Sequence, residues 1–299
     1  MTRRLLALAS LVSLAFASHA ATAPGCTATT PPTGQLIGTG LLTPSTPGPE
    51  RERLAALLMC SALAGNANSM EVAGSLYRWG PRHPAHVFPE DHARARDLLT
   101  GAAYQGRLAA MFKLAELELA EGNAHEAMVW VQVENAYFRQ RFGQTPGGDS
   151  PAGAGYYTML LKRVGDALGP FDEQLMLREV NARFAAIDQR VKAQPPRQGN
   201  SPPLGQVHRP ANARTGRLTK EEYASGLYAQ YFVEVAPDGH IARRWLIDAY
   251  PEPTSGERLA RAVDQMSWDA LPAGNTEMRY VLLPVSMGSV QQGVKLQKP

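Results

Sequence analysis

The chain has little net charge and, after its first residues, no long hydrophobic run. It contains 30 Lys and Arg against 27 Asp and Glu among 299 residues. A chain this close to neutral has no overall field to attract nucleic acid or an anionic membrane. The basic pair Arg243 and Arg244 beside Trp245 is too small for a nucleic-acid stacking platform, so no nucleic-acid partner is expected. Beyond residue 17, no window approaches the ~20 apolar residues that span a bilayer.

The sequence also lacks the common motifs of catalysis. It contains no Gly-x-Ser-x-Gly nucleophile elbow, and no glycine-rich turn is followed by Gly-Lys-Ser or Gly-Lys-Thr. Glu116, Glu118 and Glu121 could supply an acid–base pair, but their spacing is more typical of a solvated helix face. We expect neither catalytic residues nor a cofactor site.

One cluster has the composition of a metal site. Three histidines and two carboxylates lie close together in the sequence: His83, His86, Glu90, Asp91 and His92. Imidazole and carboxylate groups bind zinc, and the spacing of three between His83 and His86 would allow both to reach one ion. The intervening prolines predict a loop, however, and no His-Glu-x-x-His helix fixes the geometry. The favoured interpretation is a solvated loop without a metal.

The N-terminus has the three parts of a secretory signal peptide. Arg3 and Arg4 precede an apolar run from Leu5 to Ala17, and Ser18-His19-Ala20 places small residues at the cleavage-determining positions. The run is short for a membrane span, although an uncleaved anchor is the alternative. We expect residues 1–20 to be removed by cleavage near Ala20, giving a periplasmic or secreted protein with no global charge excess.

Both cysteines, Cys26 and Cys60, would remain after cleavage. Cys26 lies too far from the apolar run for a lipoprotein signal. In an oxidising compartment, a disulfide between Cys26 and Cys60 would tie the N-terminal segment to the first helix. Cys60 also fits as a small buried hydrophobic residue of the run from Leu54. The sequence leaves both interpretations open.

Stretches rich in proline, glycine and small polar residues divide the chain. Residues 21–50 contain much Thr, Pro, Gly and Ser and predict a flexible lead-in. The dense prolines of residues 191–216 favour extended backbone and predict an interdomain linker. Two folded units would remain, a helical domain at 51–190 and a smaller domain at 217–290, followed by a tail at 291–299.

The helical domain resembles itself at an offset of 41 residues. Apolar residues recur three and four apart, as in Leu54, Leu57 and Leu58, which is the helical period. The matching positions are Gly65, Ser69, Ala73, Gly74, Tyr77 and Gly80 with Gly106, Ala110, Leu114, Ala115, Glu118 and Glu121. Small residues let helices approach closely, and a period of about 40 residues is typical of a helical-repeat solenoid.

Two segments of this domain carry a further pattern. They are Asp91-His92-Ala93-Arg94-Ala95, continuing to Ala102-Ala103-Tyr104-Gln105-Gly106, and Asn123-Ala124-His125-Glu126-Ala127. Here the chain resembles the Sel-one-like repeat family, relatives of the tetratricopeptide repeat, over about two units at residues 65–135. Glu118 replaces the usual tyrosine, and Pro81 to Pro89 is an insertion. The resemblance implies a scaffold whose concave, helix-lined surface binds a protein.

The smaller domain changes to a period of two. Tyr231 to Val235 alternates as a strand does, a turn follows at Pro237-Asp238-Gly239, and His240 to Ile247 predicts the returning strand. An amphipathic helix is expected over Ser255 to Asp269 and a final strand over Met278 to Met287. The predicted fold class is therefore a helical-repeat solenoid followed by a small α+β domain, with one helix packed on an antiparallel sheet.

This order of elements also resembles the C-terminal domain of the TonB family of periplasmic energy transducers. The matching segments are Val233-Glu234-Val235-Ala236-Pro237-Asp238-Gly239, Leu259 with Ala262-Val263, Trp268, Leu271-Pro272-Ala273-Gly274, and Val281 to Val285. The family's Tyr-Pro signature before the first strand is missing, and Glu221-Glu222-Tyr223 stands there instead. The resemblance implies the fold, whereas energy transduction would also require an uncleaved anchor.

These features predict a non-enzymatic protein-protein interaction adaptor of the cell envelope. The edge of the final strand, at Tyr280, Leu282 and Pro284, is the candidate partner-binding edge, because unpaired main-chain groups accept an added strand. The expected partner is an envelope protein, for example an extended segment of an outer-membrane protein. The first alternative is a TonB-like transducer anchored in the membrane by its uncleaved leader. The second is a hydrolase whose site assembles from distant residues.

Overall fold

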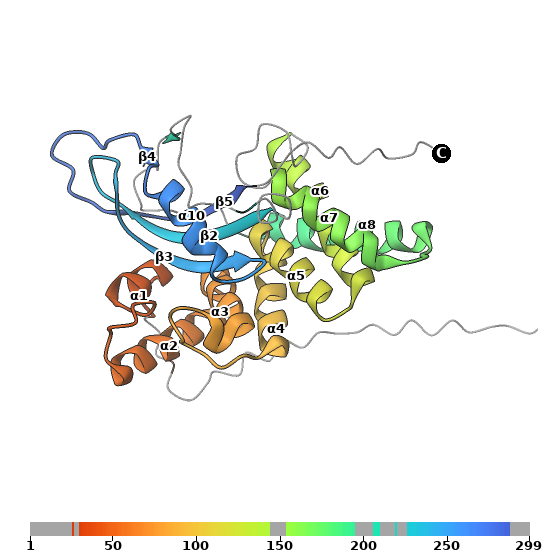
Figure 1. Ribbon diagram of the computed structural model, residues 1–299, viewed down its shortest axis with the longest axis horizontal. Helices are drawn as coiled ribbons and strands as arrows, with labels where there is room; N and C mark the ends of the chain where they lie inside the picture. Colours follow the sequence, from red (N-terminus) through yellow and green to blue (C-terminus); the bar gives the residue numbers. More distant parts are fainter. Residues whose placement is uncertain are drawn as a thin grey trace, which may run out of the picture.

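The computed structural model describes residues 26, 30–143, 154–194, 206–209, 219 and 226–287. Within these residues the chain is helical first and later forms a small antiparallel sheet, an α+β arrangement (Figure 1). The predicted signal peptide, most of the predicted linker and the tail lie outside the described residues. In the part of the chain that is described, no helix is both long and apolar enough to cross a membrane.

The N-terminal part of the described chain consists mainly of helices. They are α1 (Thr33–Thr39), α2 (Gly48–Leu63), α3 (Ala67–Trp79), the 3-10 helix η1 (Gly80–Arg82), α4 (His92–Ala103), α5 (Leu108–Ala120), α6 (Ala124–Phe142), α7 (Ala154–Leu168) and α8 (Glu173–Lys192). α3 packs closely on α4, and α5 on α6. Gly74 permits the first of these contacts, because a Cβ atom there would lie 2.8 Å from the Leu99 side chain.

The segment before residue 51 is folded, so the flexible lead-in predicted for residues 21–50 is wrong over its described part. α1 and the turn after it bury Leu36, Ile37 and Leu41 against α2 and α3. α2 begins at Gly48, a few residues before the predicted boundary. The prediction failed because α1 is a single short helix, held by tertiary contacts rather than by a periodic pattern that the sequence could display.

The later part contains a three-stranded sheet and a smaller strand pair. β2 (Leu227–Val235), β3 (Ile241–Tyr250) and β5 (Arg279–Met287) pair in the order β3-β2-β5, and both pairings are antiparallel. β1 (Val207–His208) pairs with β4 (Ser267–Trp268), so part of the predicted linker belongs to a strand. α10 (Ser255–Val263) ends before its predicted limit, because the chain that follows it turns to pair: the Trp268 N–H donates to the Gly239 carbonyl at 2.8 Å.

Both faces of the sheet are covered, one by α10 and the other by the N-terminal helices (Figure 1). Apolar side chains of the sheet face α10: Leu227, Ala229, Tyr231, Val233, Val235, Leu283 and Val285. The alternate residues Tyr228, Gln230 and Phe232 point to the helices, where they meet side chains of α1, α3, α5 and α7. Every residue of β2 is therefore buried.

One core joins the helices to the sheet, which contradicts the prediction of two separately packed units. Tyr228 and Tyr250 of the sheet belong to the same cluster as Phe112 of α5 and Tyr156 of α7. Their rings meet directly, with centroids 4.7 Å apart for Phe112 and Tyr228. The expected concave surface is occupied as well, because the sheet covers α3 and α5. The prediction failed because it took the proline-rich stretch at 191–216 as a linker between two independent units, whereas the contacts that join them come from residues far apart in the sequence.

Candidate functional site

The three histidines between η1 and the start of α4 have three different environments. His83 is 1% exposed, and its Nδ1 accepts a hydrogen bond from the Ala85 N–H at 3.1 Å. His86 is exposed, and His92 pairs with Glu121 at 2.9 Å. Burial lowers the pKa of His83 to about 4, so the solvated loop predicted here is wrong at this residue. Over the described ranges, no group of three His, Cys, Asp or Glu side chains could hold a metal ion.

Cys26 and Cys60 form a disulfide, with their Cα atoms 5.4 Å apart. Cys60 lies near the C-terminal end of α2, whereas Cys26 precedes α1. The two cysteines are 34 positions apart in the sequence, and the bond attaches the start of the described chain to α2. A cross-link of this kind reduces the entropy of the unfolded chain and favours the folded arrangement of α1 and α2.

A layer of charged side chains is buried where α3 and α5 meet β2 and β3. Glu71, Lys113 and Asp248 are each 0% exposed. The Lys113 Nζ atom lies 3.3 Å from Glu71 Oε1 and 3.6 Å from Asp248 Oδ2. It also donates to Ser75 Oγ at 2.7 Å and to Gln230 Oε1 at 2.6 Å. The buried cation is therefore neutralised by one carboxylate from the helices and one from the sheet.

Asp248, on β3, accepts hydrogen bonds from two further side chains of this layer. Trp79 Nε1 donates to Asp248 Oδ1 at 2.6 Å, and the Tyr250 hydroxyl donates to Oδ2 at 3.2 Å. The Arg78 guanidinium lies 3.8 Å from Oδ1 and between two rings, 4.5 Å from the centroid of Trp79 and 4.1 Å from that of Tyr250. Burial alone would lower the pKa of Arg78, but its acidic and phenolic neighbours raise it, so the residue stays charged.

Glu71, on α3, is held in its charged form by its neighbours in the layer. Its carboxylate accepts from Arg107 Nε at 2.6 Å and from Gln230 Nε2 at 2.7 Å, in addition to its pairing with Lys113. Burial would raise the pKa of this carboxyl, but the two cations outweigh burial and lower the pKa to about 2. Glu71 thus has hydrogen-bonded partners of opposite sign in Arg107 and Lys113. Asp248 instead accepts its hydrogen bonds from the neutral Trp79 and Tyr250 side chains, and the Lys113 and Arg78 cations lie 3.6 and 3.8 Å away.

The glutamates of α5 do not form the solvated face that was predicted for Glu116, Glu118 and Glu121. Glu116 and Glu118 are only 4% and 3% exposed, and Glu121 is the partly exposed member of the three. Glu116 accepts from the Tyr156 hydroxyl at 2.9 Å and pairs with Arg163, both on α7. The two partners of Glu116 lie 40 and 47 positions further along the chain, so the local spacing could not reveal its burial.

The three central charges of this layer lie among one another and their polar neighbours beneath the sheet, and all three are fully buried. What the layer does is fix one register of the sheet on the helices, because a shift would leave Lys113 or Asp248 buried without a partner. The sheet is therefore held as a rigid element.

The predicted partner-binding edge lies on β5, an outer strand of the sheet. Tyr280 is 42% exposed, its ring stacks on Phe232 with centroids 5.6 Å apart, and its hydroxyl donates to Glu234 Oε1 at 2.8 Å. Leu282 packs against the apolar cluster that contains Phe232, and Pro284 is half-buried. Among the described residues, β5 pairs with β2 along one edge and with no strand along the other.

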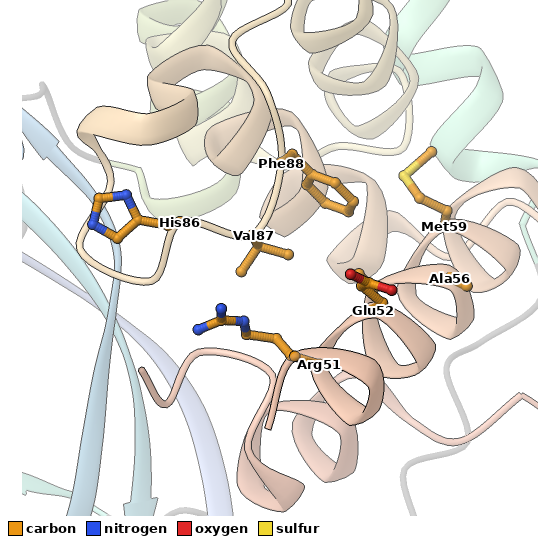
Figure 2. Close-up of a pocket in the computed structure, with 9 residues that line it drawn as sticks. Arg51, Glu52, Ala56, Met59, His86, Val87 and Phe88 are labelled. Atoms are coloured by element: carbon orange, nitrogen blue, oxygen red, sulfur yellow. The ribbon is translucent and has the colours of Figure 1, made fainter. Parts of the chain in front are cut away.

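A groove of about 350 Å³ separates α2 from the loop that joins η1 to α4. Its lining consists of Gly48, Arg51, Glu52, Ala55, Ala56 and Met59 of α2 and of His86, Val87 and Phe88 of the loop. In Figure 2 the Arg51 side chain extends toward Val87 and His86, and the Glu52 carboxylate lies on the side of Phe88. The groove combines apolar walls with one acidic and two nitrogen-bearing side chains.

No protein-family model matches the chain, and no curated protein or solved structure matches it.

Proposed function

We propose that this protein is a non-enzymatic adaptor of the cell envelope, in which the outer edge of β5 binds an extended segment of a partner protein. The observation that carries the proposal is the position of β5, which pairs with β2 and has no second partner strand among the described residues. A strand edge of this kind offers unpaired N–H and C=O groups, and an added strand gains main-chain hydrogen bonds there.

The proline of β5 indicates which backbone groups face the partner. Proline cannot donate to a ladder and is tolerated in an edge strand when its nitrogen faces away from the neighbour. If Pro284 has this orientation, the alternation of an antiparallel ladder turns the N–H and C=O groups of Tyr280 and Leu282 outward as well. α7 packs against β5, and its Tyr156 and Met159 side chains lie beside Gly226 together with the Met287 carbonyl, at the last residue of the strand. The open part of the edge is then the first half of β5.

The buried charged layer supports this role by making the sheet rigid. An edge that is already held in an extended form loses little conformational entropy when a segment pairs with it. The contacts between Lys113 and Asp248 and between Trp79 and Asp248 join β3 to the helices. β2 pairs with both β3 and β5, so the edge strand is supported as well. The helices thus support the edge rather than offering their own covered face to a partner.

We also propose that the helices include Sel-one-like repeats and that the sheet with α10 is a TonB-like C-terminal domain. Gly65 and Gly106, 41 residues apart, both have positive φ angles in the turns before α3 and α5, as expected of equivalent positions in Sel-one-like repeats. The order β2, β3, α10, β5 is the order expected of a TonB-like C-terminal domain. The predicted signal peptide and the disulfide both fit an oxidising compartment outside the cytoplasm.

Site-directed photocrosslinking in cells tests the binding edge. A photoreactive amino acid at Tyr280 should give one defined protein adduct, whereas the same group at Glu257, on the exposed side of α10, should not. With the photoreactive group moved to the exposed Glu277, just before the open end of β5, Tyr280→Pro should abolish the adduct, because it removes an outward N–H, and Tyr280→Ala should retain it. Equal labelling from Tyr280 and Glu257, or equal adducts for the two substitutions, would contradict the proposal.

The N-terminus of the mature protein tests the location. We expect the chain to begin after Ala20 and to be released with the soluble envelope fraction, which mass spectrometry of the native protein will establish. An intact leader in the membrane fraction would instead favour the anchored, TonB-like transducer.

A further inference from the structure

The groove between α2 and the loop before α4 has one regular wall. Its α2 residues recur at intervals of three and four positions, so they form a single stripe along the helix. Within this stripe Ala55 is buried and Met59 is half-buried, which leaves an apolar floor. Arg51 and Glu52 rise from the same helix, with the Arg51 side chain directed toward His86 and the Glu52 carboxylate on the side of Phe88 (Figure 2).

The opposite wall is a loop anchored at three points. His83 and Ala85 are buried beneath it, and the Phe88 ring stacks on Tyr77 with centroids 4.2 Å apart and planes 6° from parallel. His86 lies between these anchors with a φ angle of +47°, the left-handed region that few residues other than glycine adopt. Such backbone angles persist only where the surrounding structure imposes them and are frequent in binding sites. The wall is therefore preformed.

The charges in the groove are available to a ligand. Arg51 donates one hydrogen bond to the Pro44 carbonyl at 3.3 Å, and no ion pair of Arg51 or Glu52 occurs among the described residues. The neighbouring charges on α2 differ, because Arg53 and Glu50 neutralise each other at 2.7 Å. A sequence-adjacent pair of opposite charges has thus been left unpaired on the groove side, while the pair beside it is matched.

We infer that this groove is a second binding site, which takes a short zwitterionic peptide with an aliphatic side chain between its two charges. The carboxylate of the peptide pairs with Arg51 and approaches His86, and its ammonium group pairs with Glu52. The aliphatic side chain covers Met59 and Phe88. Because the cation and the anion of the groove have fixed positions, charge complementarity selects one direction of the peptide. It rejects peptides of the same shape that carry no charged groups.

Titration of the isotope-labelled mature protein with capped tripeptides tests the inference by NMR. Acetyl-Asp-Leu-Lys-amide, the reversed acetyl-Lys-Leu-Asp-amide and the neutral acetyl-Asn-Leu-Gln-amide are the probes. We expect one of the two charged peptides to bind with a Kd on the order of 1 mM, as befits a small open site, and at least 5-fold more tightly than the other two. Shifts should be confined to α2 and to residues 83–88.

Substitutions on one helix separate the site from general charge effects. Arg51→Gln and Glu52→Gln should each weaken binding at least 5-fold, and the exchange Arg51→Glu with Glu52→Arg should reverse the preferred peptide direction. The matched control, Arg53→Gln with Glu50→Gln, alters the neighbouring pair and should leave the Kd unchanged. Absence of binding, equal binding of the neutral peptide, or an equal loss in the control variant would overturn the inference.

Discussion

The two faces of one sheet are buried in different ways. The face under α10 is closed by aliphatic side chains and by Tyr231, and its partner residues on the helix are Leu259 and Val263. The face under α3 and α5 buries aromatic rings together with Lys113, Asp248 and other ionisable groups. Strands that are only nine or ten residues long therefore carry both kinds of core.

Each face obtains its specificity from a different kind of contact. Burial of apolar area is favourable but non-directional, so the α10 face tolerates small shifts of its side chains. A buried charge must meet one partner at one distance, so the helix-facing side permits a single arrangement. We expect the first face to supply mainly stability and the second to fix how the sheet sits on the helices.

Removal of the buried cation should have the largest effect. Lys113→Met leaves Glu71 and Asp248 facing each other without the group between them, and we expect the free energy of unfolding to fall by about 3–5 kcal/mol in urea titrations. The control is Lys162→Met on α7, whose side chain is 47% exposed and whose loss should cost less than about 0.5 kcal/mol. A loss below about 1 kcal/mol for Lys113→Met would show that the layer is hydrated.

An apolar truncation on the other face should come next. Leu259→Ala leaves a cavity between α10 and the sheet, and we expect a loss of about 3 kcal/mol. Because no charge is involved, the loss should be the same at pH 5 and pH 8 and at low and high salt. A loss that varied with either condition would contradict the distinction between the two faces.

The loss of stability that a lower pH causes on the helix-facing side should be smaller than the losses from these two substitutions. His83 has a folded pKa of about 4 against an ordinary value of 6.5, so the unfolded state binds its proton first as the pH falls. The contribution of neutral His83 to stability is complete above pH 6.5, and it is lost as the pH falls from 6.5 to about 4. Relative to His83→Asn, the wild-type chain should lose about 2 kcal/mol between pH 7 and pH 5. Parallel stability curves for the two proteins would refute the assignment.

Two tyrosine hydroxyls allow the smallest and most direct comparison. The Tyr250 hydroxyl donates to the Asp248 carboxylate, whereas the Tyr231 hydroxyl, on the α10 side, donates to the neutral carbonyl of Gly256. Hydrogen bonds to charged groups contribute more, so Tyr250→Phe should cost about 2 kcal/mol and Tyr231→Phe about 1 kcal/mol in the same unfolding assay. The reverse order would contradict the account of the charged face.

Local patterns predicted the elements of the sheet well. The turn at Asp238-Gly239, the start of α10 at Ser255 and the final strand follow from turn chemistry and from the change of hydrophobic period. The coarse order, helices first and a small antiparallel sheet later, was also predicted. These features depend on residues that are close together in the sequence.

The docking of the sheet on the helices could not be predicted in the same way. Its contacts join residues far apart in sequence, 169 positions for Trp79 and Asp248 and 117 for Lys113 and Gln230. One signal was available: β2 is apolar at nearly every position, which is typical of a strand covered on both faces. The groove was missed because its walls meet only through the fold, although Arg51 and Glu52 are adjacent.

Scanning calorimetry of the mature chain is the most direct test that the helices and the sheet share one core. The account predicts a single transition whose calorimetric and van't Hoff enthalpies agree, because the sheet cannot leave the helices without exposing Lys113 and Asp248 unpaired. Two resolved transitions, with the sheet melting apart from the helices, would contradict it.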